Sequence, residues 1–272
     1  MDMMRGAQIA EAALTDWRKL AQGLHARYEV PDFATGVRFL AAVGEAGDAA
    51  GHHPMVTMVR GCVDLRLTSA DAVYRDDEGT EYIVEWVTQK DVDLARRISE
   101  LAAEQGLTPD PAAVVDFELG LETENAERVA PVWAALLTGD PASQGRGTPG
   151  EEIRDATRRV PNLWFDSADE GAADEGDAAA GAPAQRFHIE VYVAAEVAQE
   201  RIDAAVAAGG TVVDDSQPGL TVIADPDGNR GVVCVDVAAA GGLSSLAGAL
   251  GGGDARSLEK MEDAIAESAT DA

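Results

Sequence analysis

The spacing of apolar positions predicts alternating helices and strands in the first half of the chain. Apolar residues recur every three to four positions from Ala7 to Leu24 and again from Phe33 to Ala50, so both segments are expected to be amphipathic helices. Between them, His25–Val30 alternates apolar and polar positions, which is typical of a strand. The second helix is expected to turn four side chains inward: Val37, Phe39, Leu40 and Val43.

A hairpin and a capped helix complete this half. Residues 55–58 and 62–67 alternate on either side of the Arg60-Gly61 dipeptide, which predicts a β-hairpin. Thr88 and Asp91 form a capping box at the start of a third helix. The expected inward face of that helix is Val92, Leu94, Ala95, Ile98 and Leu101. The order of these elements predicts an α+β layer with helices on one face of an antiparallel sheet.

The second half contains an internal repeat. Phe117–Leu121 and Phe187–Val191 are similar strand-like segments, and each leads into a helical pattern. Thr221–Ala224 and Gly231–Val237 are further strand candidates around a turn at residues 225–229. Both copies therefore have the order strand, helix, further strands.

Composition and breaker residues divide the chain. Two prolines and a glycine near residues 106–111 predict a boundary after a first domain, 1–107, and before a second, 112–237. Residues 166–185 are acidic and hold almost nothing that could pack a core, so a disordered loop is expected there. Residues 239–272 begin Gly-rich and are expected to form a tail with one short optional helix.

The charge balance excludes several classes of partner. With 21 basic and 49 acidic side chains the formal net charge is −28. Such a field repels phosphate and anionic lipid, so neither a nucleic acid nor a membrane surface is an expected partner. The N-terminal segment lacks the apolar core of a signal peptide, and no apolar run of ~18 residues occurs, so a cytoplasmic protein is expected.

The dipeptide His52-His53, followed by Pro54, is the sharpest chemical feature. Imidazole titrates near neutral pH and can give or take protons there. Adjacent strand residues point to opposite faces, but Pro54 holds His53 extended and the helix exit can turn His52 round. Both rings can then reach one pocket. The alternative is one histidine in a turn and one packed against the core.

These residues, with others in the same order, resemble the pterin-4a-carbinolamine dehydratase family over nearly all of residues 14–105. The matching positions are Trp17, Phe33, Phe39, His52-His53-Pro54, Val63–Thr68, Thr88, Asp91, Leu94 and Ala95. The resemblance implies an oligomeric antiparallel sheet backed by helices that eliminates water from 4a-hydroxytetrahydropterin to give quinonoid dihydropterin. His52 and His53 would be catalytic, one histidine taking the pterin N5 proton while an acid protonates the departing hydroxyl. Neither a metal nor a cofactor is implied.

The sequence departs from this family in two places. The family normally supplies a third active-site histidine where this chain has Ala70, and residues 73–87 are an insertion. The candidates for contacting substrate in place of that histidine are Asp71, Glu81 and Glu85. Because Ala70 cannot move a proton, the alternative function is a non-catalytic protein that binds a pterin or another small molecule.

Residues 112–237 resemble the glyoxalase and vicinal-oxygen-chelate family, which implies paired βαβββ modules forming a cupped sheet. Metal-binding members take ligands from positions that match Glu118 and His188, and a further carboxylate from a position that is Val232 here. Two ligands hold a divalent ion poorly, so no metal is expected. An apolar pocket lined by Trp133, Trp164 and Val232, with His188 as its polar anchor, is expected instead. A third possibility places the activity of the chain in this domain.

Overall fold

The computed structural model of this chain describes most of its first half and parts of its second. The described residues are 1–75, 79–123, 126, 130, 134, 152–153, 161–166, 187–224 and 230–236. They form two compact units. The first comprises Met1–Val115, Val193–Ala198 and the chain from Val235, and the second comprises Asp116–Tyr192 and Gln199–Cys234. No helix among the described residues has the length and apolarity needed to cross a membrane.

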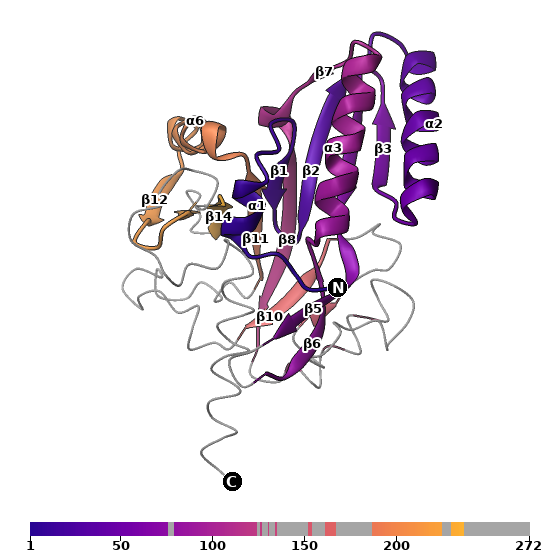
Figure 1. The fold of residues 1–272 in the computed structure, drawn as a ribbon. Helices are drawn as coiled ribbons and strands as arrows, with labels where there is room; N and C mark the ends of the chain where they lie inside the picture. Colours follow the sequence, from indigo (N-terminus) through magenta and orange to yellow (C-terminus); the bar gives the residue numbers. More distant parts are fainter. Residues whose placement is uncertain are drawn as a thin grey trace, which may run out of the picture. The chain divides into compact units, whose positions relative to one another are not determined.

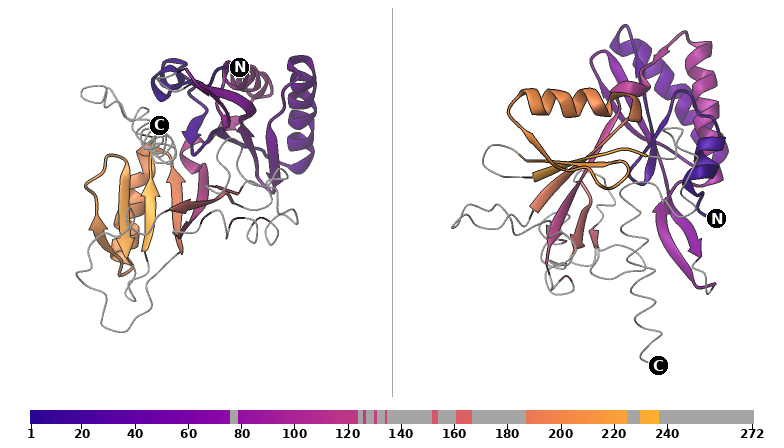
Figure 2. Two further views of the ribbon diagram at one scale, coloured as in Figure 1. Left: turned by 90° about the horizontal axis from the view of Figure 1, so that it is seen from below. Right: turned by 90° about the vertical axis from the view of Figure 1, so that its left-hand side faces the viewer.

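The first unit is an antiparallel sheet with helices packed against it (Figures 1 and 2). Its elements, in chain order, are α1 (Gly6–Glu11), β1 (Arg18–Leu20), β2 (Gly23–Glu29), α2 (Phe33–Ala50), β3 (Met55–Val59), β4 (Cys62–Leu67), β5 (Ser69–Arg75), β6 (Glu81–Trp86), α3 (Gln89–Glu104) and β7 (Thr108–Pro109). The sheet order is β1-β2-β4-β3, β7 adds to β2, and β5 pairs with β6 as a separate hairpin. This confirms the α+β prediction for the first half.

Helices α2 and α3 lie side by side (Figure 1). Their apolar faces pack against the sheet. The core joins Tyr28 of β2, Phe39 of α2, Leu65 of β4 and Ile98 of α3, all buried. All five side chains expected inside α3 are buried. Burying each large aliphatic or aromatic side chain contributes about 1.5–3 kcal/mol, so this cluster is the main source of stability for the unit.

One expected inward residue of α2 is wrong. Val37 is 49% exposed, whereas Gly36 and Gly47 share the buried face with Phe39 and Val43. A Cβ at Gly36 would approach Met58 Sδ to 2.6 Å, so the missing side chain allows the helix close to the sheet. A hydrophobicity pattern does not count glycine as an inward residue, and for that reason it misplaced the helix face.

The helix expected over Ala7–Leu24 is also wrong. Helix α1 stops at Glu11, and Ala13 has a left-handed φ of 52°, which an α-helix cannot continue through. Residues 18–20 instead form β1, which turns back at Ala21 to pair with β2. Trp17 and Leu24 are buried by this tertiary arrangement and not by one helix face.

Residues 73–87, expected to be an insertion, form the hairpin β5–β6 together with Ser69–Ala72. Ser69 pairs with Trp86 and Ala72 pairs with Val84, so two residues of β5 lie opposite the single residue Glu85 of β6. This β-bulge places Ala70 across from Glu85, and bulges of this kind re-aim side chains locally. The turn residues 76–78 lie outside the described part of the chain.

The second unit contains a seven-stranded sheet in the order β12-β13-β14-β11-β8-β10-β9. Its elements are β8 (Val115–Glu122), β9 (Glu152–Ile153), β10 (Leu163–Asp166), β11 (Phe187–Val193), α6 (Ala195–Ala207), β12 (Thr211–Asp214), β13 (Leu220–Ala224) and β14 (Arg230–Cys234). In both repeats the first strand pairs in parallel with the last, β8 with β10 and β11 with β14. This confirms the expected sheet of the second half, and the second module shows the expected order of strand, helix and three strands: β11, α6, β12, β13 and β14.

Several expectations fall partly outside the described residues. Of the expected disordered loop 166–185 only Asp166 is described, and its backbone belongs to strand β10. The tail 239–272, the turn at 225–229 and Trp133 lie outside the described residues. Strand β14 ends at Cys234, three residues before the expected end.

Candidate functional site

The two histidines follow directly from the end of α2. Gly51 has a left-handed φ of 60°, which ends the helix, and the His52 backbone N–H donates to Gly47 O at 3.1 Å. Pro54 then leads into β3. This sharp exit explains why neighbouring histidines have different surroundings.

His52 is tied to the first turn of α3. Its Nε2 lies 2.7 Å from Asp91 Oδ1, the His52 side chain is 13% exposed, and that of Asp91 is fully buried. The sequence pattern identified Asp91 as a helix cap and did not indicate this second role. A capping carboxylate has two oxygens, and only the tertiary structure shows what the second oxygen binds.

The other oxygen of Asp91 is saturated by donors. Oδ2 accepts the Thr88 backbone N–H at 2.8 Å, the Thr88 hydroxyl at 2.9 Å and the Ser69 hydroxyl at 2.8 Å. Burial acts to raise the pKa of Asp91, but the hydrogen bonds from His52, Thr88 and Ser69 together hold it below its ordinary value. Asp91 is therefore a fixed, buried negative charge at neutral pH.

This charge determines which nitrogen of His52 can do chemistry. An ionised carboxylate only accepts hydrogen bonds, so His52 Nε2 carries a proton and donates it to Asp91. The second nitrogen, Nδ1, is the one that does not bind Asp91. Asp91 thus fixes the orientation and tautomer of the ring, as a carboxylate partner does for other functional histidines.

His53 occupies a different environment. Its Nε2 lies 2.9 Å from Asp48 Oδ1, and the two side chains are 56% and 84% exposed. A Cβ at Gly47 would come within 2.7 Å of His53 Cδ2, so the ring rests against the last turn of α2. The structure thus gives the two rings separate partners, His52 a buried one and His53 a solvated one.

The three acidic candidates of the hairpin β5–β6 also differ from one another. Asp71, like Ala70 before it, is exposed in the bulge, and Glu81 is 57% exposed and pairs with Arg75 at 2.8 Å. Glu85 is only 14% exposed and lies 3.6 Å from Arg66 Nη1, a guanidinium that is itself 11% exposed. Among these three acids, Glu85 is therefore the one held in a shielded position.

Arg66 is held by residues that the sequence pattern did not single out. Its Nη2 donates to Gln22 Oε1 at 3.3 Å, and a Cβ at Gly23 would meet Arg66 Nε at 2.9 Å. The missing side chain at Gly23 thus gives the guanidinium its place. An arginine on the polar side of an alternating strand is too common in sequences to have indicated such a role.

In the second unit, Glu118 and His188 lie on the neighbouring strands β8 and β11. Gly120, also on β8, lies against the His188 ring. A Cβ at Gly120 would fall 2.3 Å from His188 Cε1 and 2.8 Å from Trp164 Cζ2. The rings of Trp164 and His188 meet edge to face with centroids 5.0 Å apart. Gly120 is therefore required for the histidine and the tryptophan to pack together.

A buried carboxylate, Glu190, lies beside this group. Glu190 Oε2 accepts the Tyr192 hydroxyl at 2.6 Å, and Oε1 lies 3.9 Å from His188 Nε2, beyond hydrogen-bonding distance. Burial raises the pKa of Tyr192 well above its ordinary value, and the negative charges of Glu190 and Glu118 raise it further. Tyr192 therefore remains a neutral hydrogen-bond donor.

These residues do not fit the metal that the vicinal-oxygen-chelate resemblance implies. Glu118 Oε1 accepts Asn162 Nδ2 at 3.0 Å, and His188 packs against Trp164. By register, Trp164 lies opposite Gly120 in one module just as Val232 lies opposite Glu190 in the other, so both last strands present an apolar residue. Within the described part of the chain no three His, Cys, Asp or Glu side chains are arranged to hold an ion.

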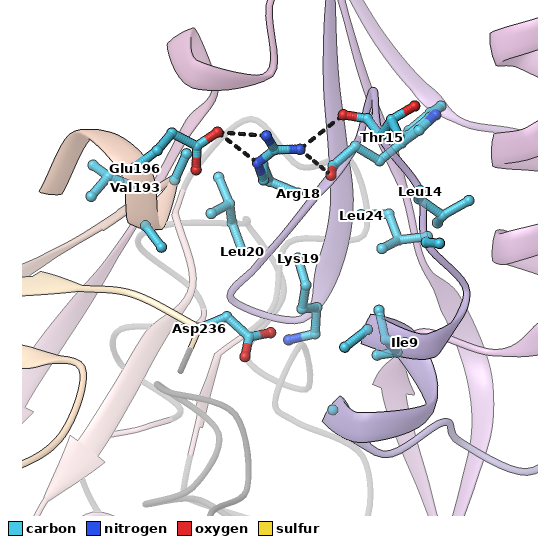
Figure 3. A pocket seen from close by; sticks show the side chains of 16 residues that line it. Ile9, Leu14, Thr15, Arg18, Lys19, Leu20, Leu24, Val193, Glu196 and Asp236 are labelled. Atoms are coloured by element: carbon cyan, nitrogen blue, oxygen red, sulfur yellow. Dashed lines mark hydrogen bonds and ion pairs between the residues drawn. The ribbon is translucent and has the colours of Figure 1, made fainter. Parts of the chain in front are cut away.

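A pocket of about 360 Å³ lies in the first unit, and Figure 3 shows its lining. Its apolar wall includes Ile9, Leu14 and Leu24, and Arg18 at its edge donates to Thr15 O at 3.0 Å. None of its lining residues belongs to the network of His52 and Asp91. We assign no chemistry to it.

Comparison with known proteins gives a match for each half of the chain. Residues 3–101 match the family model for pterin 4 alpha carbinolamine dehydratase, and residues 112–234 match the model for a glyoxalase-like domain. A putative pterin-4-alpha-carbinolamine dehydratase of Koribacter versatilis is 33% identical over 94 residues, which are 35% of this chain and 87% of that protein. A protein with the same description from Natronomonas pharaonis is 34% identical over 101 residues, 37% of this chain and 97% of that one.

Among solved structures, a transcriptional coactivator/pterin dehydratase from Brucella melitensis aligns with a TM-score of 0.31 and 23% identity, covering 37% of this chain and 99% of that one. The two family models match the same parts of the chain as the resemblances seen in the sequence. Through its N-terminal hundred residues the chain belongs to the pterin-4a-carbinolamine dehydratase family, and residues 112–234 of the same polypeptide match the model for a glyoxalase-like domain.

Proposed function

We propose that the first unit eliminates water from a 4a-hydroxytetrahydropterin and gives the quinonoid dihydropterin, with His52 in proton transfer. Membership of the dehydratase family supports this reaction class. The observation that carries the proposal is the 2.7 Å contact of His52 Nε2 with the buried carboxylate of Asp91. It leaves one imidazole nitrogen with a fixed orientation and a proton to exchange.

In the proposed mechanism the His52 imidazolium donates its Nδ1 proton to the hydroxyl on C4a. The C4a–O bond breaks, water leaves, and the electron pair of the N5–H bond forms the C4a=N5 double bond as a base removes the N5 proton. Asp91 stays ionised and compensates the cation while the ring is charged. In this proposal His53, which is exposed, exchanges protons with solvent and helps return His52 to its starting state.

The test is turnover of chemically generated 4a-hydroxytetrahydropterin by the purified full chain. We expect His52→Gln to lower kcat about 10²–10⁴-fold, the usual contribution of a positioned acid or base, and His53→Gln to lower it less. Far-ultraviolet circular dichroism should show that both variants are folded. Equal activity of the His52 variant and the unmodified chain would remove His52 from the mechanism.

A second candidate function is binding of a pterin without turnover, and Ala70 is the residue that favours it. Ala70 carries no group that can move a proton. This function predicts that tetrahydropterin binds in calorimetry while the rate of dehydration stays at the uncatalysed value. Turnover that depends on His52 would exclude it.

A further inference from the structure

The mechanism above, on which this inference rests, needs a base for the N5 proton besides the acid His52. His53 is not a shielded base, because its ring is 56% exposed and its partner Asp48 is 84% exposed. The base must lie beside the network of Asp91 and be shielded enough to be held in one position.

The hairpin β5–β6 brings one carboxylate to such a position. Its first residue, Ser69, donates to Asp91 Oδ2 and pairs along the strand with Trp86. Glu85 immediately precedes Trp86, so it is joined to His52 through a short chain of contacts: Trp86, Ser69 and Asp91. In the ladder Glu85 lies opposite the bulge residues Ala70 and Asp71.

Arg66 holds the carboxylate of Glu85 in place. The guanidinium lies 3.6 Å from Glu85 Oε1, and both side chains are more than four-fifths buried. The guanidinium also donates a hydrogen bond to Gln22, and the missing side chain at Gly23 leaves room for it. An ionised carboxylate accepts protons and hydrogen bonds and donates neither, so a carboxylate held here suits the role that His52 leaves open.

We propose that Glu85 is the base that removes the N5 proton in the elimination. In this step the N5–H bond breaks, its proton passes to a Glu85 carboxylate oxygen, and its electron pair forms the C4a=N5 bond. His52 supplies the proton that leaves with the hydroxyl as water. Two protons are thus exchanged with the protein in each turnover, and solvent restores both groups.

The first test replaces Glu85 and compares it with an exposed glutamate outside the site. We expect Glu85→Gln to lower kcat about 10²–10⁴-fold and to remove the acidic limb of the pH profile, while Glu100→Gln, whose side chain is 63% exposed on α3, stays within twofold of the unmodified chain. Glu85→Asp should retain part of the activity. A purely structural role for Glu85 would instead lower the thermal midpoint without removing the limb.

The second test removes the carboxylate of Glu85 and introduces a new base on the opposite strand, at Ala70. Ala70 lies opposite Glu85, so a histidine there can reach the same region. The double variant with Ala70→His and Glu85→Gln should therefore have a kcat at least about tenfold above that of Glu85→Gln alone, and its acidic limb should shift toward the pKa of imidazole. Ala70→Gln in that background is the matched control and should restore nothing.

The outcomes separate this inference from the proposed function. If the unmodified chain shows no turnover, the dehydratase function itself fails. If it turns over but folded Glu85→Gln is equally active with an unchanged pH profile, only the assignment of Glu85 fails. Full loss of activity in Glu85→Gln without any rescue by Ala70→His would limit Glu85 to holding Arg66, and would overturn its role as the base.

Discussion

At the residue scale, the candidate site depends on how one buried carboxylate is shared. Asp91 satisfies the start of α3 with one oxygen and binds His52 with the other. A capping residue is normally solvated, whereas Asp91 is fully buried and accepts four hydrogen bonds. Its negative charge is therefore required both for the fold of α3 and for the orientation of the imidazole.

The depressed pKa of Asp91 leads to a prediction about stability and pH. Because its folded pKa lies below the ordinary 3.8, the ionised form stabilises the fold above about pH 4, and this contribution is lost as the pH falls through the lowered folded pKa. Asp91→Asn should lower the free energy of unfolding by about 1–3 kcal/mol at pH 7, the usual cost of unsatisfied buried donors. Urea titrations at pH 7, 4 and 3 measure this.

The test compares the free energy of unfolding of Asp91→Asn with that of the unmodified chain at each pH. The difference between Asp91→Asn and the unmodified chain should shrink between pH 4 and pH 3, since protonated Asp91 resembles the amide. Asp93→Asn, an exposed neighbour on the same helix, is the control and should change little at any pH. A difference that is constant over this range would mean that Asp91 is not ionised in the folded state.

At the element scale, the position of His52 depends on where α2 stops. The sequence predicted α2, the hairpin β3–β4 and α3 correctly because each has a clear local signal: a helical period, alternation or a capping box. It failed over residues 7–24, where the burial of Trp17 and Leu24 mimics a helical period although β1 and β2 produce it. The partner of His52 could not be predicted, since it joins elements 39 residues apart.

Two glycines of α2 offer a matched test of this stop. Gly44 lies inside the helix and Gly51 at its end, and a Cβ at either would meet nothing within 4 Å. Only Gly51 has a left-handed φ, so Gly51→Ala should lower the free energy of unfolding by about 1 kcal/mol, whereas Gly44→Ala should raise it by about 0.5–1 kcal/mol. Thermal unfolding monitored by circular dichroism measures both.

The same pair of variants reports on the site. Displacement of the helix end should weaken the contact of His52 with Asp91, so Gly51→Ala should also lower kcat for the dehydration, while Gly44→Ala should not. If both variants have the same free energy of unfolding, the left-handed conformation of Gly51 does not contribute to the stability of the fold.

At the scale of the whole molecule, two units with different chemistry share one polypeptide. The first brings together a histidine and shielded acids, whereas the second surrounds His188 with Trp164, Gly120 and a Glu190–Tyr192 hydrogen bond. The structure places Glu118 and His188 on neighbouring strands. The hydrogen bond from Asn162 to Glu118 joins residues 44 positions apart, and a single sequence does not specify such a pairing.

The last prediction concerns the metal content of the full chain. With a net charge of −28 the protein attracts divalent cations to its surface weakly and without a defined site, so weak binding alone is not informative. A specific site would need three or four converging ligands, and Trp164 and Val232 stand where the two last strands would supply them.

Elemental analysis of untagged protein should therefore find less than about one tenth of an equivalent of zinc, nickel or manganese. Calorimetric titration with each ion should give the same weak isotherm for the unmodified chain and for His188→Ala, because surface carboxylates cause it in both. Near-stoichiometric metal that disappears in His188→Ala would show that the second unit holds an ion after all, and would move the search for catalysis to that unit.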